Sequence, residues 1–192
     1  MSDKPHPVPN PPFWTRFSVT TGNAIQLTGI VLGAAVIYLD GRLDAAEIVR
    51  IVLMILAFLA IYICCHSLGH YLIGRLVGIH FRGYGLRGTD HPEAYPPGVR
   101  QAMSAMPFFT VMTEKSSMAK AKPVARAVMF AAGETSSIVC SLAAGWFAGY
   151  ERIPGGGILL IVAIVASLFA IVSAFFPKGD YAKALGALRV TP

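Results

Sequence analysis

The sequence predicts an all-α integral membrane protein with about four transmembrane helices. Hydrophobic residues make up 55% of the 192-residue chain and charged residues only 14%, whereas a soluble domain carries about 25% charged residues. The mean hydropathy is +0.60. Four apolar segments are each long enough to cross a bilayer, because about 20 helical residues span its hydrocarbon core.

The leader, residues 1–21, is expected to be disordered and to enter the membrane interface at Phe13 and Trp14. It is polar and rich in proline, and it has no apolar core of the kind that a cleavable signal peptide needs. Residues 22–192 are expected to form a single transmembrane domain, because the chain is too short for several domains.

Each expected helix is an apolar run bounded by charged or turn-forming residues. The first ends at Asp40, which glycine and arginine follow. The second is longer than one crossing requires, so it must tilt or project beyond the hydrocarbon. A short turn rich in proline and glycine separates the last two helices, which should therefore be antiparallel neighbours. The expected helices cover residues 22–39, 46–79, 124–150 and 157–176.

The connection at residues 80–123 is expected to lie in the cytoplasm or at the interface. Glycine and proline make its first half irregular, and residues 101–112 are amphipathic and suit the interface. Lysine and arginine concentrate in this connection, the leader and the tail, so both termini and residues 80–123 are predicted to be cytoplasmic. Anionic headgroups explain the net charge of +6, and no nucleic-acid partner is needed.

Two histidines four residues apart, His66 and His70, interrupt the second apolar segment. This spacing places both side chains on one face of a helix, about 6 Å apart along its axis, where both could bind one ion. Ionisable residues inside a spanning segment are costly and are functional candidates; Glu134 in the third segment is another. The alternative interpretation is a pair of core histidines that hydrogen-bond neighbouring helices.

Three short motifs resemble the site-2 protease family of intramembrane zinc metalloproteases. Residues 65–75, C-H-S-L-G-H-Y-L-I-G-R, resemble the family motif H-E-x-G-H on the second helix. Residues 132–137, A-G-E-T-S-S, resemble the segment G-P-x-x-N, with Glu134 at the proline position and Ser137 at the asparagine position. Residues 176–181, F-P-K-G-D-Y, resemble the distal segment that carries an aspartate within L-D-G.

The resemblance covers about residues 48–188 and implies a site-2-protease-like core of three helices. The family's zinc ligands correspond to His66, His70 and Asp180, and a catalytic water completes the site. Three protein ligands with one open position are usual for catalytic zinc. Around Asp180 the pattern departs from the family, because glycine precedes it and tyrosine follows it. The alternative is a solvated loop carboxylate.

Ser67 occupies the position at which the family has a glutamate general base. A serine hydroxyl is too weak a base for this role, and general acid–base catalysis commonly contributes about 10²–10⁴-fold. The sequence therefore predicts a proteolytically inactive relative in the lipid bilayer. It would bind a metal ion, a transmembrane partner protein, or both, and it could be a subunit of a larger membrane complex.

Two other functions stay open from the sequence. The chain could be an active intramembrane zinc metalloprotease in which Glu134 is the base, because a desolvated carboxyl suits proton transfer. Glu134 could equally be structural, pair with Arg75 or His70, or ligate the metal. The other alternative is a pigment- or haem-binding subunit in which His66 or His70 is the axial ligand.

Overall fold

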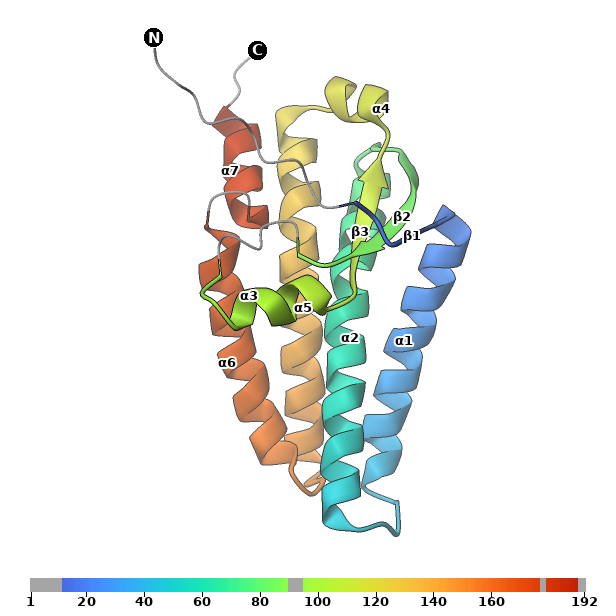
Figure 1. Ribbon diagram of the computed structural model, residues 1–192, viewed down its shortest axis with the longest axis vertical. Helices are drawn as coiled ribbons and strands as arrows, with labels where there is room; N and C mark the ends of the chain where they lie inside the picture. The colour runs from blue at the N-terminus through green and yellow to red at the C-terminus, as the bar shows by residue number, and fades with distance from the viewer. Residues whose placement is uncertain (1–11, 90–94, 177–178, 190–192) are drawn as a thin grey trace.

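Four long apolar helices run side by side along the longest axis of the protein (Figure 1). The computed structural model describes residues 12–89, 95–176 and 179–189. All four helices are long and apolar enough to cross a membrane, which confirms the predicted number. Their bounds are α1 (Val19–Asp40), α2 (Glu47–Leu76), α5 (Pro123–Tyr150) and α6 (Gly156–Ala174).

Local sequence explains where these helices begin. The side chain of Ser18 accepts a hydrogen bond of 3.1 Å from the backbone N–H of Thr21, which caps α1. Pro123 is the first residue of α5, where its missing N–H costs nothing. Before α6, Gly155 has a φ of 79°, a left-handed conformation that glycine adopts without strain. The predicted ends differ from the observed ones by a few residues.

The prediction of an all-α protein is wrong in one respect, because the protein is mostly helical but contains a sheet. Three antiparallel strands pair in the order β1-β2-β3. Part of the expected disordered leader forms β1 and the start of α1, while residues 1–11 lie outside the described residues. The strands are β1 (Thr15–Phe17), β2 (Phe81–Arg87) and β3 (Phe108–Thr113).

The glycines of β2 explain why the sequence suggested irregular structure there. A Cβ atom on Gly83 would lie 2.3 Å from the carbonyl oxygen of Phe17, so this position must lack a side chain for β1 to approach. Glycine inside a strand often marks such a close approach of another backbone. The amphipathic stretch at residues 101–112 forms most of the short helix α3 (Val99–Ala105) and part of β3, and its place at the membrane interface stays a prediction.

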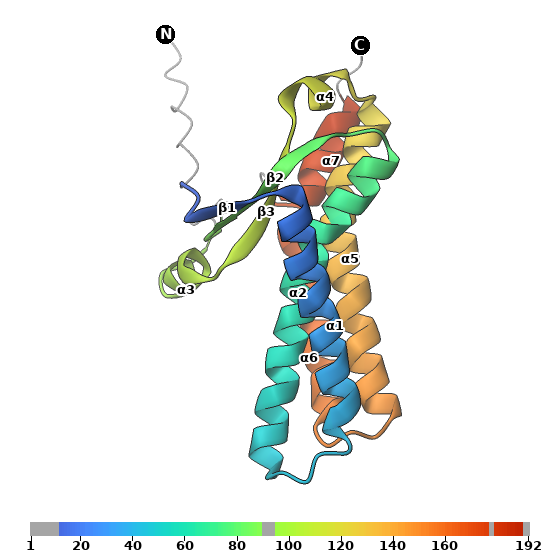
Figure 2. The same ribbon diagram turned by 90° about the vertical axis from the view of Figure 1, so that its right-hand side faces the viewer.

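Two further short helices complete the end of the bundle where the sheet lies. These are α4 (Lys115–Lys120), after β3, and α7 (Asp180–Arg189), after α6. Figure 2 shows the sheet tilting away from the long helices, with α3 at its outer end. Inside the bundle α5 is central, because α2, α6 and α7 all pack against it, whereas α1 packs mainly on α2.

Exposed aromatic side chains mark both ends of the bundle. Trp14 precedes β1 at the sheet end and is 54% exposed, while Trp146 and Tyr150, near the far end of α5, are 66% and 74% exposed. Tryptophan and tyrosine are enriched at both membrane–water interfaces. Large apolar side chains cover the outward faces of the helices between these ends, as contact with lipid requires.

The orientation of the bundle stays a prediction, which cysteine labelling would test. We expect Ser116→Cys, between β3 and α5, to react with a membrane-impermeant maleimide only from the cytoplasmic side. Asp44→Cys, in the turn between α1 and α2, should react only from the opposite side. The native cysteines lie within α2 and α5, so the parent protein is the control. Labelling of Ser116→Cys from outside would reverse the predicted topology.

Candidate metal centre

His66 and His70 lie on the same side of α2 and close to each other, as their spacing predicted. Their ring centroids are 4.9 Å apart and the ring planes meet at 84°. His70 is buried and His66 is partly buried. Both residues belong to the C-terminal half of α2 (Glu47–Leu76), and this is the end of the helix that lies beside the sheet (Figure 1).

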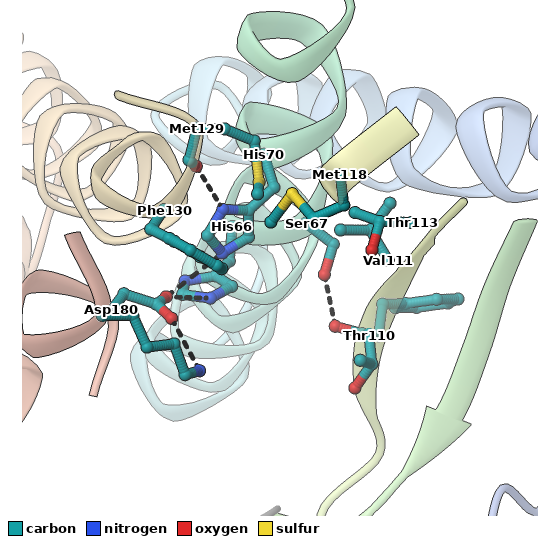
Figure 3. Close-up of a pocket in the computed structure, with 12 residues that line it drawn as sticks. His66, Ser67, His70, Thr110, Val111, Thr113, Met118, Met129, Phe130 and Asp180 are labelled. Carbon is teal, nitrogen blue, oxygen red and sulfur yellow. Dashed lines mark hydrogen bonds and ion pairs between the residues drawn. The ribbon is translucent and has the colours of Figure 1, made fainter. Parts of the chain in front are cut away.

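Asp180, the first residue of α7, completes a three-residue cluster with the histidines. Its Oδ2 atom lies 3.2 Å from Nε2 of His66 and 3.1 Å from Nε2 of His70 (Figure 3). The candidate ligand atoms of all three residues lie within 4.8 Å of one another. The structure therefore brings the three predicted ligands together, and Asp180 is not a solvated loop carboxylate.

Packing of α7 against α5 holds Asp180 in this position. Ala184 and Ala187 of α7 are buried against Ala127 and Phe130 of α5. Burial alone would raise the pKa of the Asp180 carboxyl, but hydrogen bonding and positive charge from the two imidazoles outweigh burial and hold this pKa well below its usual range. Asp180 is therefore a carboxylate at neutral pH.

Hydrogen bonds orient both rings so that the same nitrogen faces the cluster. The Nδ1–H group of His70 donates to the backbone carbonyl of Met129 over 2.7 Å. Nδ1 of His66 lies 3.3 Å from Oγ of Ser137. Such partners fix the ring orientation of metal-binding histidines and raise their basicity. Both Nε2 atoms are thereby left to face Asp180.

The donor set fits a zinc ion, and so do the two distances that Asp180 makes to the histidines. Two imidazole nitrogens and one carboxylate oxygen are common zinc ligands, at about 2.0–2.2 Å from the metal, and a tetrahedron of that size places ligand atoms about 3.3 Å apart. The contacts of 3.1 and 3.2 Å made by Asp180 agree with this spacing. The same contact is a hydrogen bond when Nε2 of His70 carries a proton, and a bound metal ion would take the place of that proton.

Gly133 makes room for His70 and was not singled out from the sequence. A Cβ atom at this position would lie 2.1 Å from Nε2 of His70. On the facing side of this contact, in α2, a Cβ atom on Gly69 would lie 2.1 Å from Oγ of Ser136 in α5. These two glycines let α2 and α5 approach closely. The available signal was a glycine directly before the intramembrane residue Glu134.

A cavity of about 280 Å³ lies between the ligands and strand β3. Ser67 is buried beside it, and its hydroxyl donates a hydrogen bond to the carbonyl of Phe109 in β3 (Figure 3). Ser67 therefore fastens the strand to α2. The remaining lining comes from β3, α4, α5 and α7, so the open side of the cluster faces β3.

Glu134 lies on the other side of His66. Its Oε2 atom is 4.0 Å from Nδ1 of His66, the ring atom that points away from Asp180. Glu134 is 9% exposed. Its nearest ionisable partner is thus His66, and it forms no ion pair with Arg75 or His70 among the described residues.

The resemblance to site-2 proteases has its support in three short motifs and in their order along the chain. The histidine motif and the aspartate segment meet in space, and the segment at residues 132–137 lies against them. Comparisons with models of protein families, with curated proteins and with solved structures found no match.

Proposed function

We propose that this chain is an integral membrane protein that binds one zinc ion through His66, His70 and Asp180 and uses this site to bind a transmembrane partner without cleaving it. The grouping of two imidazoles and one carboxylate, with ligand atoms within 4.8 Å of one another, carries the proposal. Magnesium and calcium prefer all-oxygen ligands, so this donor set favours zinc. It also favours a single ion over a macrocycle with one axial histidine.

The positions of Ser67 and Glu134 support the non-catalytic part of the proposal, because neither is placed as a general base. Bound zinc supplies Lewis acidity and lowers the pKa of a coordinated water, but a base must come within about 2.6–3.2 Å of the proton that it removes, or act through one water. The Ser67 hydroxyl already donates to Phe109. Glu134 faces the Nδ1 side of His66, so it is not placed to accept a proton in the cavity along β3.

Strand β3 offers a surface for an extended segment of the partner. It pairs with β2 on one side and, among the described residues, with no strand on the other. The bond from Ser67 shows that the carbonyl of Phe109 points away from β2. Backbone groups two residues along a strand share the same direction, so those of Val111 face the cavity as well. An extended peptide can pair with such an edge.

A cleavage assay separates this proposal from an active protease that uses Glu134. The substrate is a transmembrane peptide in proteoliposomes. We expect the parent protein to show no chelator-sensitive cleavage of this peptide. Ser67→Glu restores a carboxylate beside the first histidine and should raise cleavage at least about 100-fold over the parent. Peptide products are measured by mass spectrometry, and zinc content is measured for each variant.

Robust chelator-sensitive cleavage by the parent protein would contradict the proposal. If Glu134→Gln abolished that cleavage while zinc stayed bound, the active-protease alternative would be correct. The matched control is Glu151→Gln, which changes an exposed carboxylate at the far end of α5.

A further inference from the structure

A second cavity, of about 360 Å³, lies between α2 and α6 and meets the metal centre at His66. We propose that it binds a single-chain membrane amphiphile, with a primary ammonium head beside Glu134 and the chain directed toward the middle of the bilayer. This cavity adjoins the cavity along β3, with which it shares His66, Phe109 and Thr110, but it extends to the Glu134 side of His66. The inference does not depend on zinc binding.

The lining that α2, α5 and α6 contribute changes from apolar to polar toward the sheet, while the segment from α3 to the start of β3 adds Met103, Met106, Phe108 and Phe109. Leu59 and Ile63 of α2 line the deeper end, and His66 and Glu134 line the end closer to the sheet. Leu59 and His66 are about 10 Å apart along the axis, at 1.5 Å per residue. On α6, Phe169 and Ser173 repeat the same order in the same direction. An amphiphile with its head at the sheet end and its chain deeper matches this gradient.

Glu134 lacks the partners that a buried carboxylate needs. Its Oε1 atom is buried without a hydrogen-bond donor among the described residues, and the 4.0 Å between Oε2 and the His66 ring is too long for a hydrogen bond. A buried charge is strongly unfavourable unless it is paired and hydrogen-bonded. An ammonium group offers both a positive charge and three donors, whereas a carboxylate head would be repelled.

The cavity is placed to receive its ligand from the bilayer. Leu59 and Phe169 line it and are also 40% and 57% exposed on the outer surface of apolar helices, so they border an opening toward lipid. Met103 and Met106, from α3 and the residue after it, cover the cavity from the other side; α3 crosses in front of α5 and α6 in Figure 1. The volume is near the lower end of small-molecule pockets, about 300–1,000 Å³, which suits one chain rather than two.

Native mass spectrometry of the full chain with three probes of equal chain length tests the inference. Dodecylamine, dodecanol and dodecanoic acid share the apolar body and differ in the head. We expect dodecylammonium to bind at least about tenfold more tightly than the other two, since a hydrogen bond to a charged group is worth about 1.5–3 kcal/mol. Binding should be the same with zinc and with a chelator, so failure of the metal site would not remove it.

Two variants identify the site. Glu134→Gln should lose the preference for the ammonium head, whereas Glu151→Gln, at an exposed position, should keep it. Ser173→Phe fills part of the cavity from α6, retains the Glu134 side chain, and should weaken all three probes. Equal affinity of the parent protein for the three probes, or an ammonium preference that survives both Glu134→Gln and Ser173→Phe, would overturn the inference.

Discussion

Replacing Asp180 with alanine is expected to reduce zinc affinity by at least about 100-fold. Removal of a residue that only supports a ligand commonly costs 10–100-fold in metal affinity, and among the described residues Asp180 alone supplies a carboxylate oxygen close to both Nε2 atoms. The four long helices should stay assembled, because Ala184 and Ala187 still hold α7 against α5. Titration against a chromophoric chelator measures the affinity, and circular dichroism reports the helices.

Asp44→Ala is the matched control for Asp180→Ala. It removes an exposed aspartate from the turn between α1 and α2, far from the metal centre, and should leave zinc affinity unchanged. If Asp180→Ala bound zinc as tightly as Asp44→Ala, Asp180 would not be a ligand, and the contacts with His66 and His70 would be ordinary hydrogen bonds.

Gly133→Ala is expected to lower zinc affinity by about 10–100-fold without changing any polar group. The added methyl group would lie 2.1 Å from Nε2 of His70 and 2.5 Å from two ring carbons. The ring must move, which breaks the hydrogen bond to Met129 that orients it. Overpacking a close helix contact also costs about 1–3 kcal/mol of stability, so the midpoint of thermal unfolding should fall.

Gly186→Ala supplies the control for the change at Gly133. Gly186 lies in α7, and a Cβ atom there would meet nothing within 4 Å. This variant should keep the parent affinity for zinc and should not lose stability, because alanine favours helix over glycine. Parent affinity in Gly133→Ala would show that the position of His70 is not important for the metal.

The membrane helices were predictable because burial in lipid requires long apolar runs, and charged residues or proline interrupt these runs at Asp40 and Pro123. The sheet was not predictable from the same signals. Its central strand contains Gly83 and Gly85, which suggest a loop when the pairing partner is unknown. Pairing with β1 and β3 is a long-range interaction, and it overrides the weak local preference for strand.

Part of the metal centre was likewise predictable from the sequence, and part was not. A spacing of four residues is enough to place His66 and His70 together, because helix geometry is regular. Asp180 is 110 residues from His70, so only the order of motifs in a known family suggested its place. The carbonyl groups of Met129 and Phe109, which orient His70 and hold Ser67, are backbone atoms that any residue carries. No side-chain pattern marks them.

The zinc content of the purified protein decides whether the cluster of His66, His70 and Asp180 is a metal centre. The protein is purified without a polyhistidine tag and supplied with equimolar zinc. After a desalting column, its zinc content is measured by inductively coupled plasma mass spectrometry. We predict about one zinc ion per chain in the parent protein, and loss of this zinc in His66→Ala and in His70→Ala while both variants still insert into the membrane. A parent protein without zinc, or zinc fully retained in both variants, would contradict the proposed function.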